Sequence, residues 1–209
     1  KNLSVKIDYI SIVFETATAE DIIMHILDLP TDIFNVYPAM IKFKTYQARW
    51  QIGDIYVSGD ARKTEDNPQG LGCYLVMTGR GCDDIFRILD SRNYTFGDMF
   101  RRCERRYGLD NFHFTRLDIA IDDKNEKPFF TIEQIKKKCE KEEFISNSEG
   151  YHFDESKFDD FDTAKTVYIG AGKSGLSYRF YDKDKSASRR SILSNFILIS
   201  RLEAFDFIL

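Results

Sequence analysis

The chain has 209 residues, 43% of them hydrophobic and 14% aromatic, which is enough for one large folded domain or two small ones. Its formal net charge of −4 excludes a uniformly basic nucleic-acid-binding protein. The charge is uneven, however, because residues 140–162 carry a net charge of −7 and residues 163–203 one of +5. This pattern fits a phosphate-facing strip beside a solvated loop, or simply two ordinary surface patches.

The first half of the chain alternates between strand and helix patterns. Thr18 is a plausible helix cap, and Gly53 is expected at a turn between strands. In chain order, we expect strands at 5–16, within 40–59 and at 71–78, and helices at 19–27, 83–89 and 96–107, with a break at 79–82.

The second half begins with the clearest strand pattern in the sequence. Thr131 and Gln134 have the spacing of a capping box for a helix that follows. In chain order, we expect a strand at 112–122, a helix at 132–143, a polar acidic loop with a short strand at 146–164, and strands at 166–169, 176–181 and 195–205. The elements predict an α+β fold of mostly antiparallel sheets with helices packed on one face, in two similar half-domains at 1–108 and 109–209.

The ends of the chain favour an internal segment of a longer protein. Lys1 is an unusual start, and residues 204–209 are mostly apolar, with no cap or turn. The four cysteines have spacings that match no zinc ribbon or redox pair, so we expect reduced thiols in a cytoplasmic protein. No signal peptide is evident, and no apolar run approaches the ~18 residues that span a membrane.

Two strands carry carboxylates and arginines in alternation. In the first, Arg116, Asp118 and Asp122 share one face, and in the last, Arg201 and Glu203 do the same. Carboxylates from adjacent strands commonly hold Mg²⁺ or Mn²⁺, which acts as a Lewis acid on a phosphate oxygen. Arg116 or Arg201 would neutralise further phosphate charge. Asp118 and Asp122 lie about 13 Å apart along an extended strand, so Asp118 is the preferred ligand. A solvated strand face with arginine–aspartate pairs is the equally weighted alternative.

Tyr181 is a candidate nucleophile in a basic setting. Arg179 shares its strand face, and Lys183 follows it, so cations are available to favour the phenolate and to hold a phosphate. Residues 170–175 contain Gly-Lys-Ser, but Val167 stands where a P-loop needs glycine and a strand pattern follows instead of a helix. A hairpin turn that contacts DNA backbone through Lys173 is the better interpretation.

Several segments, in this order, resemble one known family. They are Ile7–Ser11, Gly72–Cys82, Thr115–Asp122, Tyr168–Gly170, Arg179–Lys183 and Arg201–Glu203. The family is that of the replication initiation factors of rolling-circle plasmids of Gram-positive bacteria, which also includes transposon-encoded relaxases. Its fold resembles that of the histidine-hydrophobe-histidine endonucleases, although its metal ligands are carboxylates.

The resemblance implies a DNA nickase and strand transferase that acts at a replication origin. Tyr181 matches the family's nucleophile, which forms a 5′-phosphotyrosine link and releases a 3′-OH primer, and Asp118 and Glu203 match positions near the metal. The implied partners are single-stranded or cruciform origin DNA, a host helicase and a second copy of the chain. A relaxase of a conjugative element, a non-catalytic DNA-binding module and a nucleotide-binding protein remain as alternatives.

Overall fold

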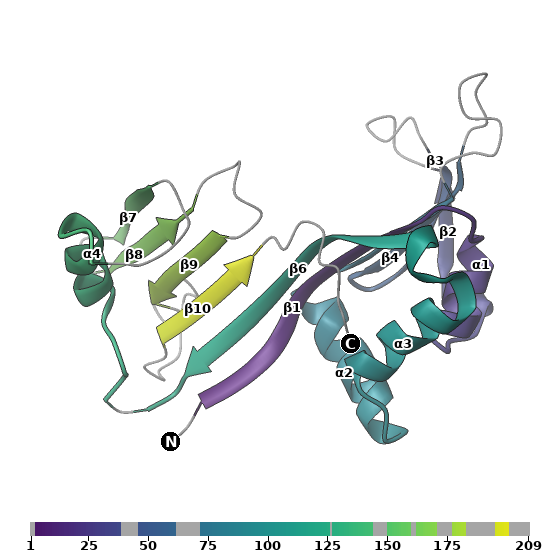
Figure 1. Ribbon diagram of the computed structural model, residues 1–209, viewed down its shortest axis with the longest axis horizontal. Coiled ribbons are helices and arrows are strands. Elements are labelled where there is room, and N and C mark those ends of the chain that lie inside the picture. Colours follow the sequence, from purple (N-terminus) through teal and green to yellow (C-terminus); the bar gives the residue numbers. More distant parts are fainter. Residues whose placement is uncertain are drawn as a thin grey trace. The chain divides into compact units, whose positions relative to one another are not determined.

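The computed structural model describes residues 3–38, 46–61, 72–125, 127–143, 150–159, 162–170, 177–182 and 195–200. Within these ranges the chain forms an α+β fold, and every strand pair whose register is defined is antiparallel (Figure 1). The chain divides between Leu117 and Asp118 into two compact units, an N-terminal unit with described residues 7–117 and a C-terminal unit with described residues 3–6 and 118–200. No helix in the described part of the chain is long and apolar enough to cross a membrane.

The N-terminal unit combines a sheet with three α-helices. Its strands follow the order β2-β3-β4-β5-β1-β6. The strands are β1 (Leu3–Phe14), β2 (Asn35–Pro38), β3 (Tyr46–Ile52), β4 (Ile55–Ala61), β5 (Cys73–Met77) and β6 (Phe112–Asp123), of which β1 and β6 also run into the C-terminal unit. The helices are α1 (Ala19–Asp21), which continues as a π-helix over Ile22–Ile26, then α2 (Gly79–Ser91) and α3 (Phe96–Tyr107), with 3₁₀ turns at Thr31–Ile33 and Leu109–Asn111.

The core of this unit lies between the helices and one face of the sheet. Ile12 of β1 pairs with Leu75 of β5, which pairs with Val57 of β4, and all three side chains are fully buried. A Cβ atom at Gly59 of β4 would lie 2.9 Å from the Cβ of Ala19, which shows how closely α1 covers this face. The alternation that predicted β1 therefore marks the face that the helices cover.

The predicted break at residues 79–82 is wrong, because α2 begins at Gly79. The N–H of Cys82 donates to the carbonyl of Thr78 at 2.8 Å, which closes the first helical turn. Gly81 is needed in this turn for packing: a Cβ there would lie 2.4 Å from the carbonyl oxygen of Asp54. Gly81, which suggests a turn in the sequence, instead lets α2 approach the backbone of Asp54 closely.

An ion-pair cluster joins α1 to α3. Arg106 donates from Nε to the Asp21 carboxylate at 2.9 Å and also from its terminal nitrogen, and the hydroxyl of Tyr107 donates to the same carboxylate. The hydrogen bond from Arg106, opposed by burial and aided by Tyr107, lowers the pKa of Asp21. Asp21 is three residues beyond the helix cap Thr18, whose hydroxyl accepts from the Asp21 N–H at 3.2 Å, so the predicted cap is confirmed.

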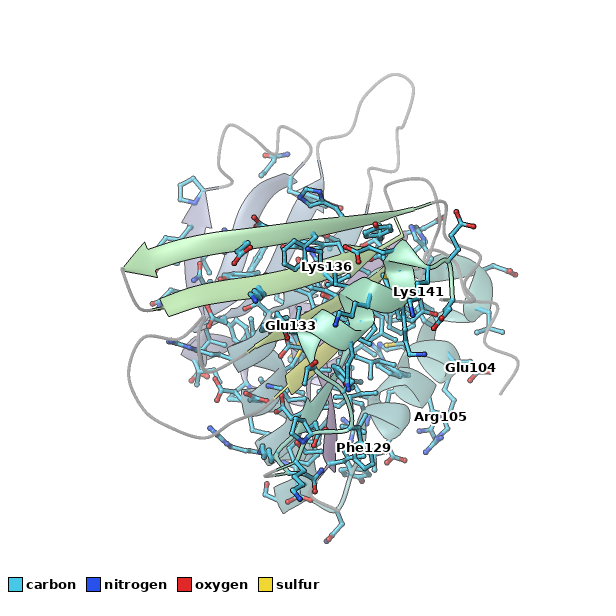
Figure 2. The ribbon with its side chains drawn as sticks, turned by 90° about the vertical axis from the view of Figure 1, so that its left-hand side faces the viewer. Glu104, Arg105, Phe129, Glu133, Lys136 and Lys141 are labelled. Atoms are coloured by element: carbon cyan, nitrogen blue, oxygen red, sulfur yellow. The ribbon has the colours of Figure 1, made fainter. Side chains whose placement is uncertain are left out.

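In its described residues, the C-terminal unit is a sheet with one helix packed on one of its faces. Its strands follow the order β6-β10-β9-β8-β7. The elements are α4 (Ile132–Glu140), β7 (Tyr151–Asp159), β8 (Asp162–Ile169), β9 (Ser177–Asp182) and β10 (Asn195–Ser200). Figure 2 shows α4, marked by Glu133, Lys136 and Lys141, lying across the green strands.

The helix α4 begins as the sequence predicts. The Thr131 hydroxyl accepts from the Gln134 N–H at 3.2 Å, and the Gln134 side chain accepts from the Thr131 N–H at 2.8 Å, so the capping box is confirmed. The helix ends at Glu140 instead of Glu143, because Glu142 adopts a φ of 57° and turns the chain. Its buried face packs against one face of the sheet; the cluster comprises Ile132, Ile135, Cys139, Val167, Ile169 and Phe180.

The predicted acidic loop at 146–164 is mostly a hairpin. β7 and β8 pair from Tyr151↔Ile169 to Asp159↔Asp162, with an irregularity near Lys157. Phe153 pairs with the fully buried Val167 and packs on the α4 cluster, so one face of a strongly charged segment is held by apolar contacts. Charge obscured the strand pattern because β7 is the edge strand, where charged residues prevent further pairing.

Candidate DNA-nicking site

The strand register of the C-terminal unit gathers four of the predicted site residues on one face. Asp122 of β6 and Tyr181 of β9 are both partners of Phe196 in β10, so they form one row across three strands. Neighbouring strands lie about 4.8 Å apart, which puts the two backbones roughly 10 Å from each other. Asp118 and Arg179 share this face by alternation, and we call it the Tyr181 face.

The helix α4 covers the opposite face of the same strands. Phe180 and Tyr178 of β9 pack on the α4 cluster, whereas Tyr181 and Arg179 alternate with them. The apolar half of β9 therefore fixes the strand, and the polar half is directed away from α4.

Tyr181 is held between an arginine and a small residue. Its ring packs against Ala120, which is fully buried and is flanked on the same face by Asp118 and Asp122. The guanidinium carbon of Arg179 lies 4.8 Å from the centre of the Tyr181 ring and 5.3 Å from that of Tyr168. A phenol, a cation and two carboxylates thus lie on one small area of a sheet.

Arg179 also has an unsatisfied hydrogen-bond donor. Its Nε is buried and has no hydrogen-bond partner among the described residues. Leaving such a donor unpaired costs free energy, and a phosphate oxygen would satisfy it. The position of Arg179 beside Tyr181 is the one that a phosphate-binding cation would need.

The two aspartates are buried, with exposed fractions of 2% for Asp118 and 6% for Asp122. The alternative interpretation of this strand, a solvated face, therefore fails at both positions. Each of them makes further interactions in the structure. Buried carboxylates are usually paired with a cation or bound to a metal, so burial makes Asp118 and Asp122 stronger candidates for site residues.

Asp123 is a buried acid that the sequence analysis did not single out. Its carboxylate accepts from the N–H of Phe129 at 2.7 Å and from the backbone and side-chain N–H groups of Asn125 at 3.1 and 2.6 Å. Burial raises its pKa, but these hydrogen bonds more than offset that effect and lower it. Asp123 anchors the segment between β6 and α4, and the Asp-x-Asn spacing was its only signal in the sequence.

Aromatic residues extend the Tyr181 face beyond the predicted residues. Tyr168 of β8 pairs with Arg179, and His152 of β7 pairs with Tyr168, so the three side chains form the next row. The rings of His152 and Tyr168 are 6.2 Å apart. The sequence indicates Tyr168 only as part of the Tyr168–Gly170 motif, because its neighbours depend on the register between three strands.

Other predicted residues lie elsewhere or outside the described ranges. Arg116 is exposed in the N-terminal unit, and its guanidinium lies 4.3 Å from the centre of the Tyr9 ring. Lys173, Lys183, Arg201 and Glu203 fall outside the described residues. The segment after residue 176 is strand β9 and not a helix, which agrees with the argument against a P-loop.

A divalent cation fits this face by ligand type. Asp118 and Asp122 provide buried oxygen donors beside Tyr181, and oxygen is the donor that Mg²⁺ and Mn²⁺ prefer. In the part of the chain that the structure describes, no three His, Cys, Asp or Glu side chains converge on a common point. The third predicted ligand, Glu203, lies outside that part.

The fold and the Tyr181 face define an α+β protein with a tyrosine, two carboxylates and an arginine on the sheet face that α4 does not cover. Family profiles match nearly the whole chain: "Rolling Circle replication initiation protein N-terminal domain" over residues 4–102 and "Replication initiation factor" over residues 112–203. The chain belongs to the replication initiation factor family, as the resemblance predicted.

Two similar proteins agree with this assignment. The "Putative DNA relaxase NicK" of Bacillus subtilis (strain 168) is 32% identical over 180 residues, which are 85% of this chain and 47% of that protein. The chain therefore spans about half the length of this curated relative. A rolling circle replication initiator protein from Geobacillus stearothermophilus superposes with a TM-score of 0.76 at 22% identity, over 97% of this chain and 75% of that one, which confirms the predicted fold.

Proposed function

We propose that the chain nicks DNA and transfers the cut strand through Tyr181, as part of a rolling-circle replication initiator or relaxase. One observation carries the proposal: the Tyr181 ring packs on Ala120 between Asp118 and Asp122, with the Arg179 guanidinium beside it. Membership of the replication initiation factor family supports the same conclusion.

The reaction requires a tyrosine oxygen that attacks a phosphorus atom. The Tyr181 hydroxyl loses its proton, its oxygen bonds to the phosphorus, and the bond from phosphorus to the 3′-oxygen breaks. The 3′-oxygen takes up a proton and leaves as a 3′-OH, while the 5′-phosphate stays on Tyr181, so a later attack by a 3′-OH can reverse the step. Arg179 neutralises phosphate charge and favours the phenolate.

The carboxylates have a separate part in this reaction. Asp118 or Asp122, which lie about 13 Å apart along the extended strand β6, would hold Mg²⁺ or Mn²⁺ together with Glu203. When bound, the metal polarises a phosphate oxygen. Asp122 lies in the row of Tyr181, whereas Asp118, the ligand that the sequence favoured, lies four residues away along β6. We therefore propose both aspartates as ligand candidates, with no preference for Asp118.

We propose two biological settings for this reaction. A plasmid initiator would act on single-stranded or cruciform origin DNA, as a homodimer with a host helicase, whereas a relaxase would nick the transfer origin of a conjugative element. The name of the Bacillus subtilis relative favours the second setting, and the solved structure from Geobacillus stearothermophilus favours the first. Supercoiled substrates that carry one origin or the other would separate them.

The test compares Tyr181→Phe with Tyr178→Phe on supercoiled origin DNA, with Mn²⁺ and then with EDTA. Tyr178 lies three residues away on the face that α4 covers, so it is a matched control. We expect nicking and a covalent adduct for the wild type and Tyr178→Phe, and neither for Tyr181→Phe. Full nicking by Tyr181→Phe would refute the assignment, and DNA binding without any nicking by the wild type would favour a non-catalytic binding module.

The carboxylates are tested with Asp118→Asn and Asp122→Asn. The control is Glu155→Gln, an exposed acid of the edge strand β7 on the face shared with Phe153, opposite to the Tyr181 face. We expect DNA binding in EDTA to persist in all three variants. Metal-dependent cleavage should fall at least about 100-fold in the first two. A variant with unchanged cleavage would remove that aspartate from the site.

A further inference from the structure

The sheet of the N-terminal unit has a second face, opposite to the one that its helices cover. Two rows of side chains on this face are fixed by the register of five strands. The first row is Tyr37, Arg49, Ser58, Tyr74 and Val13, and the second is Asn35, Gln51, Tyr56, Val76 and Ser11. We call these rows the Arg49 face.

The chemistry of the Arg49 face is aromatic, cationic and hydrogen-bonding. The guanidinium carbon of Arg49 lies 3.8 Å from the centre of the Tyr56 ring, close enough for a cation–π contact. Tyr74 stands half-buried in the same row as Arg49. Tyr37 is 48% exposed, and neither row contains an aspartate or glutamate.

Arg49 shares an unusual property with Arg179 of the Tyr181 face. The buried side-chain nitrogens that lack a hydrogen-bond partner among the described residues are the Nε atoms of these two arginines. Both guanidinium groups lie against tyrosine rings, and both stand on the sheet face that the helices of their own unit do not cover. The same donor chemistry therefore occurs twice in the chain. On the Arg49 face, the Tyr56 hydroxyl donates to the Asp54 carboxylate at 3.4 Å.

We propose that the Arg49 face binds single-stranded DNA, as a second site that takes no part in the nicking chemistry. Bases would stack on the tyrosines, and Arg49, already stacked on Tyr56, would present its in-plane N–H groups to a phosphate. The unsatisfied Nε of Arg49 is the independent observation that indicates an anionic partner.

The geometry favours a single strand over a duplex. Recognition by a sheet that carries aromatic residues requires unstacked bases, which duplex DNA does not offer. Tyr56 and Tyr74 stand on the neighbouring strands β4 and β5, about 4.8 Å apart, a spacing that suits successive bases of a DNA strand. The inference goes beyond the nicking proposal and does not require it, because the face lies entirely within the N-terminal unit.

The test measures binding of a fluorescein-labelled 20-nucleotide oligothymidylate by anisotropy in EDTA, so that no cleavage occurs. The variants are Arg49→Ala and Tyr56→Leu, with Tyr56→Phe and Arg87→Ala as controls. Arg87 is 76% exposed on α2 and pairs only weakly with Asp84, at 3.3 Å, so it tests the loss of one positive charge elsewhere.

We expect Arg49→Ala and Tyr56→Leu each to weaken binding about fivefold or more, the size of one lost stacking contact. Tyr56→Phe, which keeps the ring, and Arg87→Ala should bind as the wild type does. The slope of log affinity against log salt concentration should fall by about 0.7 for Arg49→Ala, as for one lost phosphate contact. A duplex of the same length should show no such differences.

Equal effects of Arg49→Ala and Arg87→Ala, or unchanged binding in both Arg49→Ala and Tyr56→Leu, would overturn the proposal. So would weakened binding by Tyr56→Phe, because the ring would then not be the contact. Nicking of a short oligonucleotide separates the two proposals: if the wild type cleaves nothing but binding depends on Arg49, only the nicking function fails. If cleavage depends on Tyr181 while binding ignores Arg49, only the second site fails.

Discussion

Replacing Arg179 by glutamine should change the pH dependence of DNA cleavage and not merely its rate. The guanidinium carbon lies 4.8 Å from the centre of the Tyr181 ring, and Arg179 is the described cation closest to it. With the ring centre taken as the mean position of the phenolate charge, a positive charge at that distance stabilises the phenolate by about 3 kcal/mol at an effective dielectric constant of about 20. Because both side chains are partly exposed, solvent screening reduces this to roughly 1.5–3 kcal/mol.

This energy translates directly into a displacement on the pH axis. One pH unit corresponds to about 1.4 kcal/mol, so Arg179→Gln should move the rising limb of the pH–rate profile upwards by about 1–2 units. Below the limb the rate should fall about 10- to 100-fold, and at high pH it should approach that of the wild type. Arg179→Lys retains the charge and should move the limb by less.

The assay is single-turnover cleavage of a labelled single-stranded oligonucleotide at saturating protein, from pH 6 to pH 10. Lys165→Gln is the matched control, because Lys165 lies in the next strand and pairs with Glu133 at 2.6 Å beside α4. A uniform loss of rate at every pH in Arg179→Gln would refute the electrostatic argument. An equal displacement in Lys165→Gln would show that net charge, and not position, is responsible.

Two further predictions concern stability. Asp21→Asn should lower the free energy of unfolding by about 1–2 kcal/mol at neutral pH, since it breaks charged hydrogen bonds from Arg106. The pKa of Asp21 is lowered in the folded state, so its contribution to stability is complete above about pH 4 and is lost as the pH falls through that lowered pKa. Between pH 7 and pH 2, the melting temperature should therefore fall less steeply in Asp21→Asn than in the wild type. Equal pH dependence of the two melting temperatures would contradict this. Gly81→Ala should cost more than about 2 kcal/mol in urea unfolding, because its Cβ would lie 2.4 Å from the Asp54 oxygen, whereas Gly53→Ala, with a φ of 52° and open space, should cost only about 1 kcal/mol; the reverse order would refute the packing argument.

Local patterns in the sequence located most elements of this fold. The helix α3 has the bounds that its pattern predicts, and the capping boxes at Thr95 and Thr131 explain why helix starts are readable: two side chains three residues apart satisfy each other's backbone. The break at 79–82 was misread, because the same glycine serves a turn or a close approach, and only the position of Asp54 decides between them.

The sequence predicts the site only where the alternation of side chains along a single strand defines it. Alternation puts Asp118 and Asp122 on one face, but it does not say that the face is buried or that Tyr181 is in the row of Asp122. Those facts depend on the register between β6, β10 and β9, to which residues far apart in the chain contribute. For the same reason Tyr168 and Arg49 carry no signal of their own in the sequence.

The two faces of the sheet differ in the same way in both units. The helices take the apolar face, where Ile12 or Val167 is fully buried, and leave the other face to polar and aromatic side chains. An arginine with an unsatisfied Nε stands on that second face in each unit, and around Arg179 the neighbouring tyrosine packs between two buried aspartates. A sheet of this kind can contact a nucleic acid along the face that its helices do not cover without disturbing the core, because the two sets of side chains alternate along the same strands. Substitutions at Arg49 or Arg179 should therefore change DNA interactions while leaving the helix-covered core intact.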